Sequence, residues 1–317
     1  MTAPIRNSSR AGVVVAGLGT IGQSIIREIV ADREHEFVGA VDPALSDRKL
    51  SRLCGVERPI FSSLADVEEP NDVRWRVFIQ TTVSQLSKAL PQILDAAARG
   101  WNVLSVCEEL AFPGLADPRA ARRLQEAAEK NGIAIAAVGV NPGFVLDHFI
   151  LTLTKAIRRV SSVEAIRVVD VAHRRPQLQK KAGVGLTANA FKEGLRTGRV
   201  GHIGLKESAA VVVRGLGWRL EKLQETVRPV LDPESGRVAG VRHVASVTNG
   251  PRRLRLTLEL VKGAPNPRDE ITIEGEPPIR IEIPGGVAGE PATIARVVNS
   301  IPRLVELRPG LYLPDRF

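Results

Sequence analysis

The stretch from Val13 to Gly22 reads V-V-V-A-G-L-G-T-I-G and decides the fold of the chain. Its β-branched run is typical of a buried strand. The glycines Gly17, Gly19 and Gly22 then follow with the spacing G-x-G-x-x-G, and an apolar pattern of helical period covers residues 25–30. This order predicts a strand, a tight glycine turn and a helix.

A second apolar run ends at Asp42, about twenty residues after the last glycine of the turn, which is the spacing of a dinucleotide-binding βαβ unit. The acid at this place accepts hydrogen bonds from a ribose diol, and the glycines let the backbone approach a pyrophosphate. Free N–H groups at the start of the helix, around Thr20 and Ile21, then bind the phosphates. We therefore predict that the chain binds NAD or NADP.

The choice between the two cofactors depends on Asp42 and the residues that follow it. The carboxylate of Asp42 favours the free diol of NAD and repels a 2′-phosphate. Arg48 and Lys49 come shortly afterwards, and a basic side chain there would accept the phosphate of NADP. The sequence favours NAD and leaves NADP open.

The composition indicates a globular chain with two domains: it has 317 residues, of which 44% are hydrophobic. No apolar run approaches the roughly 18 residues of a membrane span, and residues 1–10 lack the apolar core of a signal peptide. Cys54 and Cys107 are too few for a disulfide framework. We therefore expect a cytoplasmic protein with no membrane partner.

The net charge of +9 raises the alternative of a nucleic-acid-binding protein. Aromatic residues make up only 4% of the chain, so few side chains could stack on bases, and the excess arginines are scattered. We interpret the charge as a solvated surface and predict no nucleic-acid partner. The histidines show no metal-ligand spacing, so no metal is predicted either.

Predicted strands and helices alternate over residues 1–145, which favours a Rossmann domain with a doubly wound parallel sheet. Strand-like runs then dominate residues 146–290 and predict an α+β domain with an open, mainly antiparallel sheet. Residues 291–317 contain a further helical pattern, and we expect this helix and tail to return to the first domain. The predicted class is therefore α/β with a second α+β domain.

Polar residues follow two strands of the first domain. Thr81 and Thr82 end one strand, and in a dinucleotide-binding domain this loop runs beside the nicotinamide ribose. Glu108 and Glu109 follow the strand of residues 102–107. In an extended segment their side chains point to opposite sides, so one would face the cleft, where a carboxylate can act as a general base. Solvated loop charges, or a carboxylate capping the next segment, are the alternatives.

Two loops could contact a substrate. Residues 139–144 read G-V-N-P-G-F, where Asn141 can orient a ligand by hydrogen bonds; a plain strand-to-helix turn is the alternative. A basic loop contains His173, Arg174 and Lys180 and could bind a carboxylate, or else be only a solvent-exposed loop.

Four motifs together resemble one family. They read S-V-C-E-E-L at residues 105–110, G-V-N-P-G-F-V-L-D at 139–147, R-R-P-x-x-Q-K-K at 174–181 and V-N-x-I-P-R-L-V at 298–305. In combination they resemble 2,4-diaminopentanoate dehydrogenase and the related native amine dehydrogenases. The wider fold resembles dihydrodipicolinate reductase, but the doubled histidine and the D-x-P-S-G-T run of that enzyme are missing here.

The resemblance implies an NAD(P)-dependent oxidative deamination of an amine, such as 2,4-diaminopentanoate, to a ketone and ammonia, and the reverse reductive amination. It implies Glu108 as the catalytic acid/base, with Glu109 the less favoured of the pair, and a homodimer formed through the sheet of the second domain. The predicted cofactor contacts are Gly17, Gly19, Thr20, Ile21, Gly22, Asp42, Arg48, Thr81, Thr82, Cys107 and Asn141. The predicted substrate contacts are Asn141, Pro142, Phe144, His173, Arg174 and Lys180.

Two other functions stay open at this point. A semialdehyde dehydrogenase would need a catalytic cysteine, and Cys107 lies at a strand end, although its two glutamate neighbours raise a thiol pKa where activation needs a lowered one. A non-catalytic NAD(P)-binding protein would need the glycine turn but not Glu108.

Overall fold

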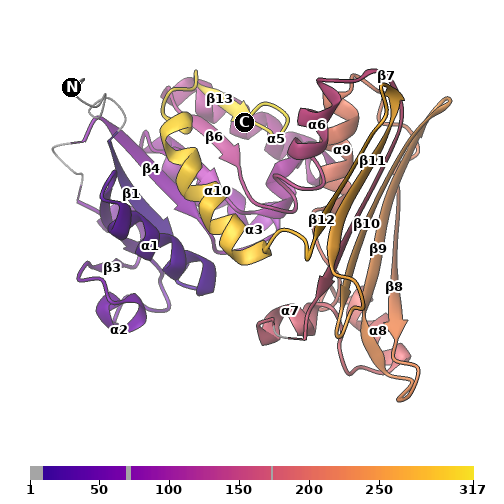
Figure 1. Cartoon of the computed structure of the whole chain (residues 1–317). Coiled ribbons are helices and arrows are strands. Elements are labelled where there is room, and N and C mark those ends of the chain that lie inside the picture. Colours follow the sequence, from indigo (N-terminus) through magenta and orange to yellow (C-terminus); the bar gives the residue numbers. More distant parts are fainter. Residues whose placement is uncertain (1–9, 69–72, 173) are drawn as a thin grey trace, which may run out of the picture. The chain divides into compact units, whose positions relative to one another are not determined.

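The computed structural model describes residues 10–68, 73–172 and 174–317. The chain divides into two compact units, which are described separately (Figure 1). Unit 1 comprises residues 1–140 and 289–317, and unit 2 comprises residues 141–288.

Unit 1 is built on a seven-stranded sheet in the order β13-β6-β5-β4-β1-β2-β3, and every pairing in it is parallel. Its strands are β1 (Ala11–Ala16), β2 (Glu36–Val41), β3 (Ile60–Phe61), β4 (Trp75–Gln80), β5 (Asn102–Ser105), β6 (Ala134–Ala137) and β13 (Gly310–Tyr312). Because all strands run the same way, their carboxyl ends meet at one edge of the sheet.

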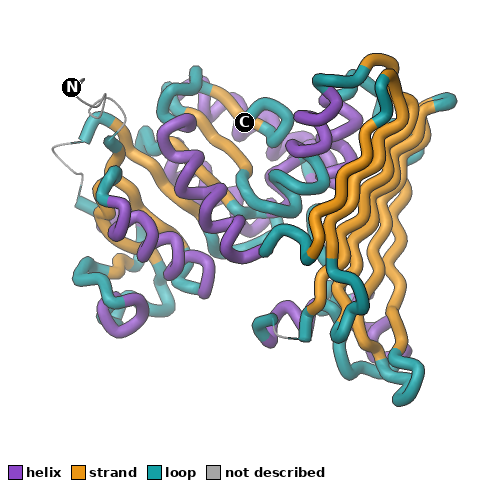
Figure 2. The backbone as a smooth tube through the Cα atoms, viewed as in Figure 1, coloured by secondary structure: helices purple, strands orange, loops and turns teal. Residues whose placement is uncertain are grey.

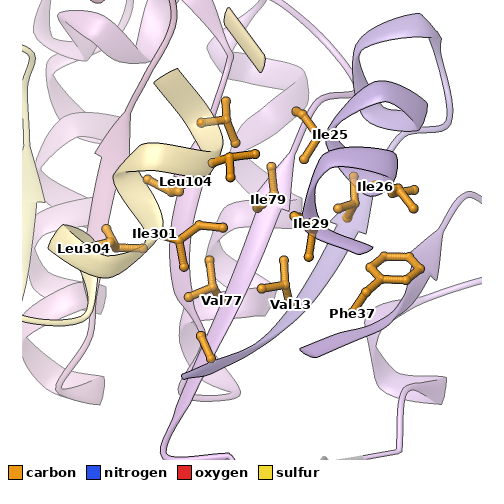
Figure 3. Close-up of a cluster of buried hydrophobic side chains, with 14 of the residues drawn as sticks. Val13, Ile25, Ile26, Ile29, Phe37, Val77, Ile79, Leu104, Ile301 and Leu304 are labelled. Atoms are coloured by element: carbon orange, nitrogen blue, oxygen red, sulfur yellow. The ribbon is translucent and has the colours of Figure 1, made fainter. Parts of the chain in front are cut away.

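Helices pack on both faces of this sheet. One face is covered by α1 (Thr20–Asp32), α2 (Leu50–Cys54) and α10 (Gly289–Leu304), and the other by α3 (Leu86–Ala98) and α5 (Pro118–Asn131). Alternate strand residues serve the two cores: Val13 contacts the first set of helices and Val14 the second, as the period of a strand requires. Figure 3 shows the first core, in which Ile301 of α10 packs near Val77 and Ile79 of β4.

Local capping explains where α5 begins and ends. Asp117 accepts a hydrogen bond from the backbone N–H of Arg119, and Pro118 occupies the first helical position, where no N–H is needed. Gly132 ends the helix in the left-handed conformation, with φ +67°. The remaining short elements of unit 1 are the 3₁₀ turns η1 (Leu64–Asp66) and η2 (Glu108–Ala111) and the helix α4 (Pro113–Ala116).

Unit 2 is built on a six-stranded sheet in the order β12-β11-β7-β10-β9-β8, traced in Figure 2. Only β7 and β10 pair in parallel, and the other four pairings are antiparallel. Its strands are β7 (Arg158–Asp170), β8 (Gln224–Leu231), β9 (Val238–Asn249), β10 (Arg252–Val261), β11 (Arg268–Glu276) and β12 (Ile279–Pro284). Its helices are α6 (His148–Thr154), α7 (Pro176–Lys181), α8 (Ala188–Arg196) and α9 (Leu205–Gly215).

The side chains of alternate residues divide the second sheet into two faces. Helix α9 packs on β9 and β10, where Val241, Ala245, Leu256 and Leu258 are buried. We call this the inner face. The opposite, outer face carries charged pairs between neighbouring strands, such as Arg242 with Glu259.

The predicted fold class is confirmed: a Rossmann sheet is joined to a second, mainly antiparallel sheet. The structure corrects some local expectations. Glu108 and Glu109 lie in a 3₁₀ turn and not in an extended segment. Helix α6 begins at His148, because the side chain of Asp147 accepts the N–H of His148 and caps the helix there.

The part of the chain that the structure describes contains no helix of sufficient length and apolar character to span a bilayer.

Candidate active site

The glycine turn of unit 1 is shaped by close backbone contacts. Gly17 has φ +92°, a conformation that side chains disfavour. A Cβ placed on Gly22 would overlap the carbonyl oxygen of Gly17, so that α1 can approach the end of β1 only with glycine there. A Cβ on Gly19 would meet nothing within 4 Å. The turn is therefore tightly packed at Gly22 and has free space beside Gly19, which we call its open side.

The start of α1 suits an anion. Its first-turn N–H groups, those of Thr20, Ile21 and Gly22, lack partners within the helix, because the acceptors would lie before its start. The capping residue is Gly19, which supplies no side-chain hydrogen bond, and the first turn contains no acidic residue. The helix end thus presents N–H groups and a positive dipole toward the open side of the turn, which fits the pyrophosphate of a dinucleotide.

Asp42, directly after β2, is attached to the same turn. Its Oδ2 accepts the backbone N–H of Leu18 at 3.0 Å, and its Oδ1 accepts the N–H of Ala44 at 3.1 Å. The two bonds fix a carboxylate beside the glycine turn. The side chain of Arg48 is exposed on the segment that follows.

Thr81, at the end of β4, also contacts the turn. Its Oγ1 lies 2.9 Å from the carbonyl oxygens of both Ala16 and Gly17, to which the hydroxyl can donate. The neighbouring Thr82 is exposed, and its hydroxyl donates to Gln92 of α3. Thr81 therefore supports the turn, and Thr82 is the member of the pair that faces solvent.

The residues after β5 have three different surroundings. Glu108 is partly exposed at the start of η2. Glu109 accepts the backbone N–H of Leu86 at 2.7 Å. The Cys107 side chain is 1% exposed, and burial raises the pKa of its thiol to about 12, so it stays a protonated thiol near neutral pH.

Strand order brings these groups to one place. β1, β4 and β5 are neighbours in the sheet, and each is followed by a predicted site residue: Gly17, Thr81 and Glu108. Because the strands are parallel, the three lie at the same, carboxyl edge.

Asn141 begins unit 2, and its loop is held by a buried carboxylate. Asp147 accepts hydrogen bonds from the N–H groups of Gly143 and His148 and from the hydroxyl of Ser208. Burial raises the pKa of Asp147, and these three donors oppose the rise. Pro142 is buried in the loop, and Phe144 is partly exposed.

Beside Asn141 lies a histidine that the sequence did not single out. His202 Nε2 is 3.2 Å from both Asn141 Nδ2 and the Asn141 carbonyl oxygen. Burial, together with the charges of His243 and Lys181, lowers the pKa of His202 to about 3, so the imidazole is neutral. The side chain therefore acts as a neutral hydrogen-bonding group.

The inner face of the second sheet holds a buried ion pair that sequence reasoning also missed. Arg167 Nη1 of β7 lies 2.7 Å from Asp269 Oδ2 of β11, and both side chains are buried. Asp269 also accepts the N–H of Val287, shortly before the chain returns to unit 1. The available signal was an arginine in phase with Val163 and Ala165, where the period of the strand requires an apolar residue.

The predicted residues of the basic loop differ in their surroundings. Arg174 is half-buried, and its charge acts on Arg167. Lys180 is exposed on α7, and His173 lies outside the described residues. Among residues 10–68, 73–172 and 174–317, no group of three or more His, Cys, Asp or Glu side chains could hold a metal ion.

A parallel sheet with this turn, followed by an α+β unit, is the architecture of two-domain NAD(P)-dependent dehydrogenases. Residues 144–314, more than half of the chain, match the family described as the 2,4-diaminopentanoate dehydrogenase C-terminal domain. The chain belongs to this family, which confirms the resemblance seen in the motifs.

Individual relatives agree with the assignment. The 2,4-diaminopentanoate dehydrogenase of Acetoanaerobium sticklandii is 26% identical over 329 aligned positions, covering 95% of this chain and 91% of the relative. The amine dehydrogenase of Mycobacterium smegmatis superposes with a TM-score of 0.82 at 22% identity, covering 98% and 96% of the two chains. The WlbA dehydrogenase of Bordetella pertussis, solved with NADH and UDP-GlcNAcA, has a TM-score of 0.52 at 16% identity, covering 88% and 75%. Both of these solved structures share the fold of this chain.

Two glycine variants separate packing from cofactor binding. Gly22→Ala forces α1 away from Gly17, and we expect a loss of about 1–3 kcal/mol in the free energy of unfolding, measured with urea. Gly19→Ala has room for its Cβ, and we expect its stability to stay within about 1 kcal/mol of wild type. Its affinity for NADH, measured by fluorescence titration, should fall, because the new methyl group lies on the open side of the turn. Wild-type affinity in Gly19→Ala would show that the phosphates bind elsewhere.

Proposed function

We propose that the chain is an NAD-dependent amine dehydrogenase that deaminates 2,4-diaminopentanoate or a similar amine to a ketone and ammonia, and catalyses the reverse reductive amination. The observation that carries the proposal is the position of Glu108, whose strand ends at the same sheet edge as the glycine turn. Family membership supports the amine as substrate.

Glu108 is proposed as the acid/base. The nicotinamide, when bound, exchanges a hydride with the carbon that carries the nitrogen. A cationic carbon–nitrogen double bond then needs a nearby negative charge, and the carboxylate of Glu108 supplies it. The same carboxylate removes a proton from the water that attacks this carbon and gives it to the nitrogen. As ammonia leaves, the carboxylate takes up the proton of the new hydroxyl group, and the ketone forms. In the direction of amination, Glu108 performs these transfers in reverse.

Asp42 supports NAD over NADP. Because both its oxygens accept backbone N–H groups, its negative charge is held beside the turn. A ribose diol can donate hydrogen bonds to this carboxylate, whereas a 2′-phosphate would be repelled by it. Arg48 is exposed and not engaged with Asp42 in any ion pair that the structure describes.

Arg174 is proposed to attract a substrate carboxylate in unit 2. Burial lowers the pKa of Arg167, Asp269 raises it and Arg174 lowers it again, so the two guanidinium groups lie close enough to repel each other. A carboxylate placed near both would relieve this repulsion. Asn141, Pro142 and Phe144 are proposed to contact the rest of the substrate, and Asn141 also the cofactor.

Cys107 is unsuited to the alternative of a semialdehyde dehydrogenase. Its Sγ donates to the carbonyl oxygen of Ser84 at 3.1 Å, and its thiol is buried and protonated. A thiol in this state is not a nucleophile. Any contact of Cys107 with a cofactor would therefore involve its backbone.

We also propose a homodimer formed through the outer face of the second sheet. Across the middle of this face, Val244, Thr257 and Ile166 are opposite one another on β9, β10 and β7. Charged pairs flank this apolar strip, including Arg242 with Glu259 and Arg255 with Glu164. An apolar centre with a charged rim is typical of an interface between proteins.

Glu108→Gln tests the catalytic assignment. The amide cannot remove a proton, and we expect turnover to fall by about 10²–10⁴-fold while the affinity for NADH is unchanged. The assays are NAD reduction with 2,4-diaminopentanoate and ammonia-dependent NADH oxidation with a panel of ketones. Wild-type turnover in this variant would refute the role of Glu108, and a wild-type enzyme inactive on every amine and ketone would refute the function.

Asp42→Asn tests the cofactor preference. The amide oxygen can still accept the N–H of Leu18, but the charge is gone, so NAD loses a charged hydrogen bond and NADP loses a repulsion. We expect the ratio of kcat/KM for NADP to that for NAD to rise about 10-fold or more. Arg48→Ala is the control and should leave this ratio near the wild-type value. A wild-type enzyme that prefers NADP, and loses the preference in Arg48→Ala, would contradict the role of Asp42.

Val244→Glu tests the dimer. The new carboxylate would be placed in the apolar strip of the outer face, opposite Thr257, and we expect a dimeric wild type to become monomeric by light scattering. Lys192→Glu, on the exposed surface of α8, is the control and should remain dimeric. A monomeric wild type, or a dimeric Val244→Glu, would rule out this interface.

A further inference from the structure

Glu109 has a contact that its neighbour Glu108 does not share. Its Oε2 accepts the backbone N–H of Leu86, the first residue of α3, at 2.7 Å. The capping residue of α3, Gln85, makes no side-chain hydrogen bond to the helix, and the first turn of α3 contains no acidic residue. A carboxylate 23 positions away in the chain therefore supplies the negative charge that the start of this helix favours.

Two further bonds join the same segments. The backbone N–H of Glu109 donates to the carbonyl oxygen of Ser84 at 3.3 Å, and the Cys107 thiol donates to the same oxygen at 3.1 Å. Residues 107–109, which carry Glu108, are thus attached at three points to residues 84–86. We call this set of three bonds the clamp.

The clamp continues toward the glycine turn. Residues 84–86 lie two positions after Thr82 in the chain, and the Thr81 hydroxyl contacts the carbonyl oxygens of Ala16 and Gly17. The loop after β4 is therefore bonded to the glycine turn at Thr81 and to the turn that holds Glu108 at residues 84–86. All of these residues belong to unit 1.

We propose that Glu109 is a positioning residue: it holds the turn that carries Glu108 in a fixed place relative to the loop beside the glycine turn. The proposal rests on the proposed function, in which Glu108 is the acid/base. It assigns the two adjacent glutamates different tasks, since a carboxylate occupied with the N–H of Leu86 at a helix start is committed to holding the loop. Glu109 need not touch the substrate for its loss to reduce turnover.

The test compares Glu109→Ala and Glu109→Gln with Glu108→Gln. In Glu109→Ala the clamp loses its side-chain bond, and we expect kcat to fall about 10- to 100-fold, as displacement of a catalytic group requires. The pH dependence of kcat/KM should keep the wild-type profile, because the proposed acid/base is still present. Glu109→Gln retains an oxygen that can accept the N–H of Leu86, and we expect its kcat within about threefold of wild type.

Hydrogen exchange reports on the clamp directly, without an activity assay. Hydrogen exchange of the Leu86 amide should be faster in Glu109→Ala than in wild type, and unchanged in Glu108→Gln. Asp117→Ala is the matched control, because it also removes a carboxylate from a helix start in unit 1, that of α5. It should lower stability to a similar degree without changing kcat or the exchange of Leu86.

The outcomes separate the two proposals. Unchanged kcat and unchanged Leu86 exchange in Glu109→Ala would overturn the positioning role. A Glu109→Gln variant as inactive as Glu108→Gln, with Leu86 still protected, would overturn it as well, because Glu109 would then itself be the acid/base. Full activity of Glu108→Gln alongside fast Leu86 exchange in Glu109→Ala would instead refute the proposed function and leave the clamp intact as structure.

Discussion

The close approach of α1 to the end of β1 is the constraint on which the arrangement of unit 1 depends. No side chain fits at Gly22, because the carbonyl oxygen of Gly17 occupies the place of its Cβ. The Thr81 hydroxyl then contacts Gly17 and Ala16 from the neighbouring strand. The turn, the helix and the end of β4 are therefore determined together, while the turn stays open at Gly19.

Sheet topology alone would place the functional residues only roughly. Parallel order brings the ends of β1, β4 and β5 to one edge, but a catalytic carboxylate must be held far more tightly than a strand end is. Local hydrogen bonds supply this tighter placement. Asp42 bonds to Leu18 of the turn, and Glu109 bonds to Leu86 beside the loop of Thr82. Asp42 and Glu109 are thus fixed parts of the scaffold, and the role in the reaction is proposed for Glu108.

The sequence predicted the elements that follow from a local pattern of apolar residues. It missed the elements that form only through contacts with distant residues. Apolar runs located β1 and the strand that ends near Thr81, β4, because these signals lie within a few residues. Glu108 and Glu109 were expected in an extended segment. The bonds that Cys107 and Glu109 make to Ser84 join residues more than twenty positions apart and leave no local pattern. The strand β13 (Gly310–Tyr312) was missed because three residues carry no period, and it forms only by pairing with β6.

The proposed recognition of a substrate carboxylate in unit 2 would rest on groups whose charge does not change near neutral pH. A buried ion pair such as Arg167 with Asp269 contributes little net stability, because desolvation offsets the attraction. Its retention on an otherwise apolar strand face therefore suits a functional role better than a packing role. His202 is neutral because burial and nearby charges lower its pKa to about 3, so the positive charge near it comes from Arg167 and Lys181, which stay charged near neutral pH. A carboxylate would therefore be attracted to a similar degree at pH 6 and pH 8, because neither His202 nor these basic side chains change charge over this range.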